Sequence, residues 1–176
     1  MLFDFPLGFI APSIYKMDIS DLPALIGTFA YGPLAGTIIE ILKILIKIVL
    51  KPTSTAFVGE ISNLLCGLAL CIPAGIIYTK KHTFNGAIKA IIIGAISYVL
   101  LGTAMNYLFI IPAYVKMFDI SLDAIISMGS QIAPIVKDKL TFCLICVAPF
   151  NLIKIVIVSI LTLLLYKRIS NLINRV

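Results

Sequence analysis

Long apolar runs separated by short polar segments make up most of this chain. A crossing of the bilayer takes about 20 apolar residues, and four runs approach or exceed that length: residues 34–50, 57–79, 86–111 and 149–168. A shorter run, residues 22–32, is followed by Gly32 and Pro33, a pair typical of a tight turn. We therefore predict transmembrane helices at residues 22–32, 34–50, 57–79, 86–111 and 149–168.

Two further segments do not fit a complete crossing. Residues 1–11 are apolar but too short to span, so we expect the outer stub of a first helix whose beginning is missing. Within residues 112–148, the segment 118–142 begins with alternating acids and apolar residues, which favours a long external loop with a short amphipathic helix. The expected fold is all-α: one integral membrane domain over residues 1–176, a polytopic bundle of six helices with the first truncated.

Composition excludes a soluble domain. Hydrophobic residues make up 61% of the 176 residues and charged residues only 12%, whereas soluble domains are about 45–50% apolar and a quarter charged. The net charge of +6 does not indicate nucleic acid, because the basic residues lie at the ends of apolar segments. Cys143 and Cys146 have C-x-x-C spacing but lack a second ligand pair, so we expect buried thiols and no metal.

The charged loops orient the predicted bundle. Residues 80–89 and 167–175 are basic and carry no acid, so the positive-inside rule places both in the cytoplasm. Six of the acids lie in the remaining loops and at their edges, which we expect outside: Asp18, Asp21, Glu60, Asp119, Asp123 and Asp138. The complete protein is therefore expected in the cell membrane with both ends cytoplasmic.

Five polar side chains interrupt the apolar runs, namely Glu60, Asn63, Asn106, Asn151 and Lys154. Such groups are expensive inside a membrane, which makes each of them a candidate site. Glu60 and Asn63 share a helix face by their spacing of three, as do Asn151 and Lys154. We expect all five near the outer ends of their helices, at one depth, where they form a shared ligand pocket.

Structural roles are alternatives for the same residues. Glu60 suits a helix start, the asparagines suit hydrogen bonds between helices, and Lys154 can reach to the interface. Glu40, Lys43 and Lys47 form a second polar row along one face. A structural ion pair is favoured there over proton transport, because no chain of titratable partners continues from the row.

No catalytic motif is present. The sequence has no Walker motif, no G-x-G-x-x-G and no nucleophile elbow, and its single histidine, His82, has no second metal ligand nearby in the sequence. We expect neither an enzyme nor a bound cofactor. A structural membrane protein without a ligand stays possible as an alternative, although it would not need five polar groups at one depth.

Four ordered strings carry a family resemblance: "DLPALIGTFAYGPLAG", "FVGEISNLLCG", "MNYLFIIP" and "PFNLIK". Over residues 3–170 the chain resembles the S components of energy-coupling factor vitamin transporters, most of all the riboflavin-specific type. The resemblance implies high-affinity capture of riboflavin outside the cell and docking on a transmembrane coupling protein driven by two cytoplasmic ATPases. An S component for another vitamin or a flavin analogue is the alternative. The docking face of the family's first helix lies upstream of this sequence, so we expect it to support capture better than uptake.

The resemblance also implies binding residues, located in the first external loop, before the fourth helix, in the fifth helix and its following loop, and early in the last helix. It implies that Asn106 and Asn151 contact ring edges or ribityl hydroxyls, that Lys154 donates and that Glu60 accepts. Tyr107, Tyr114 and Phe150 are candidates for ring stacking. The full expected set is Asp18, Leu22, Thr55, Gly59, Glu60, Asn63, Asn106, Tyr107, Tyr114, Asn151 and Lys154.

The predicted orientation can be tested by thiol labelling. In a cysteine-free background, a cysteine at Ser54 should react with an impermeant reagent on intact cells, whereas one at Thr83 should not, because the basic loop is expected inside. Labelling of both positions after permeabilisation controls for access. The opposite pattern on intact cells would invert the orientation.

Overall fold

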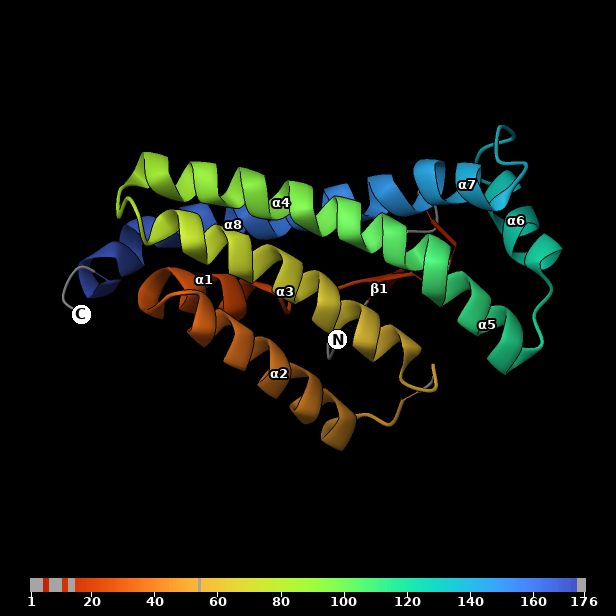
Figure 1. Ribbon diagram of the computed structural model, residues 1–176, viewed down its shortest axis with the longest axis horizontal. Coiled ribbons are helices and arrows are strands. Elements are labelled where there is room, and N and C mark those ends of the chain that lie inside the picture. Colours follow the sequence, from red (N-terminus) through yellow and green to blue (C-terminus); the bar gives the residue numbers. More distant parts are fainter. Residues whose placement is uncertain (1–4, 7–10, 13–14, 54, 174–176) are drawn as a thin grey trace.

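The computed structural model describes residues 5–6, 11–12, 15–53 and 55–173 and is a bundle of helices lying roughly along one axis (Figure 1). Two π turns join neighbouring helices, so that the described chain contains six continuous helices, as expected for an all-α membrane protein. The helices are α1 (Leu22–Tyr31), α2 (Pro33–Leu50), α3 (Val58–Tyr78), α4 (Phe84–Met105), α5 (Ile111–Phe118), α6 (Leu122–Ser130), α7 (Lys139–Phe142) and α8 (Ala148–Ile173), and the π turns are η1 (Asn106–Ile110) between α4 and α5 and η2 (Cys143–Val147) between α7 and α8.

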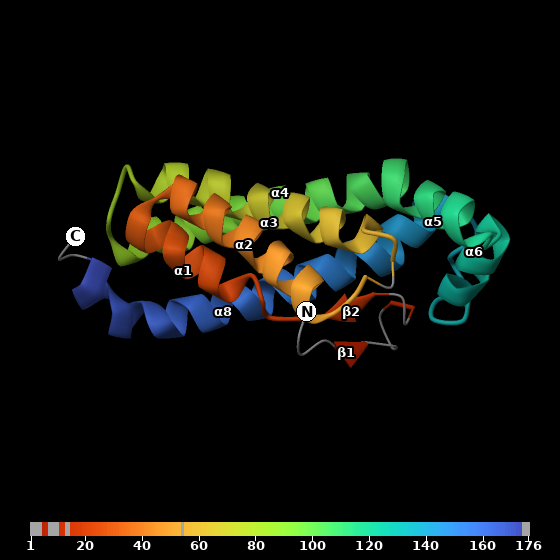
Figure 2. The ribbon, with the colours of Figure 1, turned by 90° about the horizontal axis from the view of Figure 1, so that it is seen from below.

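Short connections place sequential helices side by side. Helix α3 contacts α2 and α4, α4 contacts α8, and α1 packs against α2, α3 and α8 (Figures 1 and 2). The turn between α3 and α4 lies at the same end of the bundle as the C-terminal end of α8 (Figure 1). The basic segments at residues 80–89 and 167–175 therefore begin at one end, while α5, α6 and α7 lie at the other.

Three of the continuous helices are long and apolar enough to cross a membrane. They cover Val58–Tyr78, Phe84–Phe118 and Lys139–Tyr166. Helix α1 is apolar but has only 10 residues, and α2 carries Glu40, Lys43 and Lys47. The helices α1, α2 and α3 lie close to the ranges expected at 22–32, 34–50 and 57–79, and a crossing by α1 and α2 stays a prediction. The chain is therefore a multi-pass membrane protein.

The segment expected as a long external loop is mostly helical. Helix α5 continues to Phe118, and the last continuous helix begins at Lys139, ten residues before its expected start at Pro149. Asp138 caps that start, because its carboxylate accepts a hydrogen bond of 2.7 Å from the Thr141 amide. Only residues 119–138 connect the two long helices, and they hold the expected short helix, α6.

Proline explains why these two boundaries were predicted wrongly. Each π turn ends two residues before a proline, η1 before Pro112 and η2 before Pro149. A proline inside a helix lacks an amide hydrogen and crowds the preceding turn, which normally ends or kinks the helix. A local π turn relieves that conflict in membrane helices. The helix therefore continues through a residue that usually marks its end.

The amino-terminal stub does not form the expected helix where it is described. Residues Phe5–Pro6 (β1) pair in antiparallel fashion with Lys16–Met17 (β2), beside the bundle (Figure 2). Ala11 and Met17 pack against Phe150 of α8. The remaining residues of the stub lie outside the described residues.

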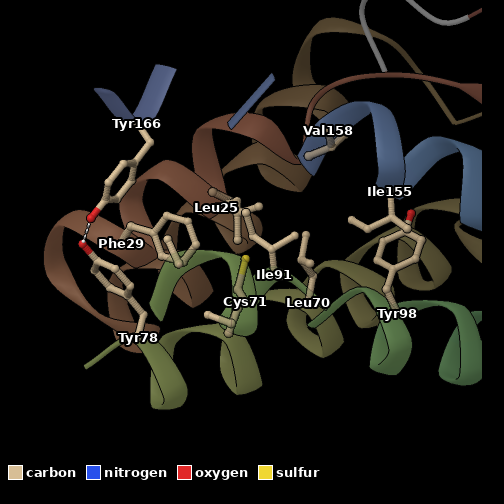
Figure 3. Packing of buried hydrophobic residues seen from close by; sticks show 14 of the residues in the cluster. Leu25, Phe29, Leu70, Cys71, Tyr78, Ile91, Tyr98, Ile155, Val158 and Tyr166 are labelled. Carbon is tan, nitrogen blue, oxygen red and sulfur yellow. Dashed lines mark hydrogen bonds between the residues drawn. The ribbon is translucent and has the colours of Figure 1, made fainter. Parts of the chain in front are cut away.

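The core is tight where α1, α3, α4 and α8 meet (Figure 3). At one end the hydroxyl groups of Tyr78 and Tyr166 are 2.7 Å apart and share a hydrogen bond. Phe29 of α1 packs on the Tyr78 ring at a centroid distance of 4.6 Å. Between α3 and α4, a methyl group added at Gly94 would lie 2.8 Å from the Leu70 carbonyl oxygen. Small residues permit this close approach of helices.

Replacing Gly94 by leucine should therefore destabilise the bundle by about 1–3 kcal/mol, since the larger side chain forces α3 and α4 apart. Thermal unfolding of the purified protein in detergent measures the loss. Ala104→Leu, on an exposed face of the same helix, is the matched control and should leave the midpoint nearly unchanged. Equal midpoints for both variants would contradict the packing described here.

Candidate ligand-binding site

A cavity of about 120 Å³ lies between the segment before α1 and the helices α3, α4, α5 and α8. Polar and aromatic side chains from all these elements converge on it. Its lining residues are Tyr15, Gly59, Ser62, Asn63, Cys66, Tyr98, Asn106, Ile110, Tyr114, Phe150, Asn151 and Lys154.

Helix α3 contributes one face to the cavity. Gly59, Ser62, Asn63 and Cys66 line it at intervals of three, one and three residues, the spacing that puts side chains on one side of an α-helix. Two of the four carry polar groups and one is a thiol. This face supplies small side chains that leave room for a ligand.

Helix α4, the π turn η1 and helix α5 contribute a second row. Tyr98, Asn106, Ile110 and Tyr114 line the cavity at multiples of four residues. The Asn106 amide nitrogen donates to the Gly102 carbonyl at 2.8 Å, and its oxygen accepts from the Tyr15 hydroxyl at 2.6 Å. Asn106 is thereby held with its amide edge against the cavity. Since π turns recur at functional sites, the position of η1 beside this cavity fits a binding role.

Helix α8 contributes Phe150, Asn151 and Lys154. The start of this continuous helix at Lys139 places Lys154 about 22 Å along its axis, whereas α3 reaches the same cavity with Gly59 and Asn63 close to its own start at Val58. The Asn151 side-chain nitrogen is buried and has no hydrogen-bond partner within the described part of the chain. An unpaired buried donor costs about 1–3 kcal/mol. Asn151 therefore offers a hydrogen bond to a bound molecule.

Lys154 is the charged group of the site. Its ammonium nitrogen lies 3.2 Å from the Asn63 side-chain oxygen, 3.2 Å from Asp21 and 3.4 Å from Asp18. Lys43 of α2 binds Asp21 from the other side and also pairs with Glu40. The expected ion pair of Glu40 and Lys43 is thus part of a larger buried cluster.

The electrostatics keep both aspartates of the preceding segment ionised. Burial alone would raise the pKa of Asp18, but the Lys154 ammonium and the hydrogen bonds from Ser20 hold it below its ordinary value. Burial likewise opposes ionisation of Asp21, and Lys154 and Lys43 together lower its pKa. Asp18 and Asp21, expected in an external loop, are instead 3% and 0% exposed.

Glu60 lies outside the cavity lining. Its carboxylate pairs with Lys47 and accepts hydrogen bonds from Thr53 at 3.1 Å and Thr55 at 2.8 Å. These contacts satisfy it without a ligand. Glu60 thereby connects the start of α3 to the end of α2 and to the loop between these helices.

The structure divides the expected site residues into two sets. Gly59, Asn63, Asn106, Tyr114, Asn151 and Lys154 line the cavity, whereas Asp18, Leu22, Thr55, Glu60 and Tyr107 do not. Tyr107 is 37% exposed, and the Lys139 ammonium lies 4.4 Å from its ring centre.

Five lining residues were not in the expected set: Tyr15, Ser62, Cys66, Tyr98 and Ile110. Tyr98 and Ile110 follow from the four-residue spacing around Asn106. Tyr15 carried no such signal, because it reaches the cavity from a distant segment.

A second cavity, of about 580 Å³, opens beside α1 and α2. Six of its lining residues are apolar, including Ile19, Leu22 and Ile39, and the others are Asp18, Ser20, Lys43 and Lys47. It lacks the converging amide groups of the first cavity. Binding sites combine apolar walls with a few placed polar groups, so the smaller cavity is the better candidate.

Comparison with known proteins finds a matching family model and two similar transporters. The family model for the ECF transporter substrate-specific component matches residues 1–166. The riboflavin transporter RibU of Staphylococcus aureus (strain TCH60) is 30% identical over 172 residues, which cover 98% of this chain and 83% of the relative. The riboflavin transporter FmnP of Bacillus subtilis (strain 168) is 25% identical over 173 residues, 97% of this chain and 84% of the relative.

A solved structure shares the fold. The S component of a bacterial ECF transporter superposes with a TM-score of 0.70 at 29% identity, covering 96% of this chain and 85% of that one. The family model and both sequence relatives match nearly the whole length described above. This chain therefore belongs to the substrate-specific components of energy-coupling factor (ECF) transporters.

Proposed function

We propose that this protein captures riboflavin from outside the cell as the substrate-binding subunit of an ATP-driven ECF importer. The family supplies the role of a substrate-specific component, and two relatives named as riboflavin transporters point to the vitamin. The observation that carries the proposal is the convergence of Asn106, Asn151 and Lys154 on one buried cavity.

Riboflavin matches the chemistry of that cavity. The vitamin has a flat ring system with hydrogen-bonding edges and a polyhydroxyl chain. An asparagine amide both donates and accepts hydrogen bonds, which suits those edges, and the unpaired nitrogen of Asn151 seeks an acceptor. The rings of Tyr98 and Phe150 supply apolar walls for stacking or edge contacts.

The cavity must widen to hold this ligand. Its volume of about 120 Å³ is below the roughly 300–1,000 Å³ of typical small-molecule sites. Tyr15 and Tyr114 are only partly buried at its edge, so movement of these side chains is the least costly way to open it. Binding then replaces the Tyr15–Asn106 hydrogen bond with contacts to the vitamin.

Transport requires other subunits. A substrate-specific component is one part of a transporter, and we propose that a transmembrane coupling protein and two cytoplasmic ATPases complete it. Both ends of the complete protein would then lie on the cytoplasmic side. Riboflavin is the cargo, and the proposal involves no resident cofactor and no reaction catalysed by this chain.

A vitamin panel tests the class of ligand. The purified protein is titrated with riboflavin, FMN, thiamine and biotin while flavin or protein fluorescence is followed. We expect tight, saturable binding of riboflavin and no chemical change in the recovered vitamin. Tight binding of thiamine or biotin alone would assign another substrate, and binding of none would favour a structural protein.

Substitution in the cavity tests the site. Asn151→Leu and Lys154→Leu should each weaken riboflavin binding by about 1–3 kcal/mol, because a buried ligand group loses its partner. The same fluorescence titration measures the affinity, and thermal unfolding checks the fold. Leu152→Ala changes the neighbouring exposed position of α8 and should bind like the parent. If both cavity variants also bind like the parent, riboflavin binds elsewhere.

A further inference from the structure

We propose that Asp18 and Asp21 are positioning residues that act on riboflavin through Lys154 and do not contact the vitamin. The inference rests on the proposed function and assigns Asp18 a different role from the direct binding expected of it. Both aspartates pair with the Lys154 ammonium and neither lines the cavity with Asn106 and Asn151, although Asp18 lines the second, larger cavity. The juxtaposition of two buried carboxylates with one pocket ammonium is the observation that carries it.

The buried Lys154 ammonium requires nearby carboxylates for its charge to be stable. The side chain of Lys154 is 4% exposed, and those of Asp18 and Asp21 are 4% and 0% exposed. A buried charge is costly unless it is paired and hydrogen-bonded. The two carboxylates therefore fix a buried ammonium group in the wall of the cavity.

The three residues that contact the Lys154 ammonium differ in whether they line the cavity. The Lys154 ammonium donates to the Asn63 side-chain oxygen at 3.2 Å and to Asp18 at 3.4 Å, and it forms an ion pair with Asp21 at 3.2 Å. Of these three residues, Asn63 alone lines the cavity, where Tyr98 also lies beside the ammonium, with its ring centre 5.9 Å from the nitrogen. A ligand oxygen can therefore replace the Asn63 oxygen at the ammonium while both aspartates keep their places.

Asp21 is also held by a second lysine, Lys43. Its second carboxylate oxygen binds Lys43 of α2, so its carboxylate bridges the pocket lysine and the α2 lysine. An aspartate at a helix start commonly accepts from the helix amides, but Asp21 makes no such cap bond. Its carboxylate is committed to the two ammonium groups, as a positioning role requires.

The test is a double-mutant cycle on riboflavin affinity. Asp18→Asn and Asp21→Asn are each made in the parent and in a Lys154→Met background, and all proteins are titrated with riboflavin and checked by thermal unfolding. Residues that act only through Lys154 lose their effect once it is gone. We expect each Asp→Asn change to weaken binding about tenfold in the parent and less than about twofold in the Met background.

Asp123→Asn is the matched control. It makes the same chemical change on an exposed position of α6 and should leave the affinity within about twofold of the parent. A similar loss in this variant would show a general effect of charge and would overturn the inference. If Asp21→Asn does not fold, Asp18→Asn decides the cycle, because Asp18 lies in a segment outside the helices.

The outcomes separate the two proposals. Equal losses in the parent and Met backgrounds would mean that the aspartates contact the vitamin or act independently of Lys154, and would overturn the inference alone. Unchanged affinity on removal of either carboxylate would do the same. A parent protein that binds no riboflavin would overturn the proposed function and the positioning role together.

Discussion

The neutralisation of one buried ammonium group organises the centre of this protein. Lys154 lies in α8, and its carboxylate partners come from the segment before α1, where Asp18 is 136 residues earlier in the chain. Because an unpaired charge there would be very costly, the segment before α1 must lie across the bundle against α8. The same cluster also attaches α2 to the segment before α1, since Asp21 binds Lys43 of α2. The cavity forms on the remaining open side of the ammonium.

Two π turns complete the site by a different mechanism. Each precedes a proline by two residues, η1 before Pro112 and η2 before Pro149, and each lies next to cavity residues. Both long helices continue past their prolines because the π turn absorbs the local conflict. The cavity walls near these prolines are therefore parts of continuous helices. A helix that ended at either proline would instead leave backbone groups unpaired.

Apolar run length predicted the membrane bundle and the ranges of α1, α2 and α3, since crossing length and tight turns are local properties of the sequence. The rarity of amides and charges in apolar runs was enough to select Asn106, Asn151 and Lys154. The Lys154 partners could not be predicted, because ion pairs across the bundle depend on tertiary structure. For the same reason Glu60, which pairs with Lys47, was indistinguishable from a cavity residue. Pro149 misled the prediction because proline more often starts a helix than continues one.

An experimental structure of the protein with riboflavin bound tests the central claim most directly. The account predicts the flavin ring between α3, α4 and α8, with a ring or ribityl oxygen within hydrogen-bond distance of the Asn151 side-chain nitrogen and of Lys154. Asp18 and Asp21 should remain on the far side of the ammonium. A flavin bound in the larger apolar cavity between α1 and α2, or one in direct contact with either aspartate, would contradict the account.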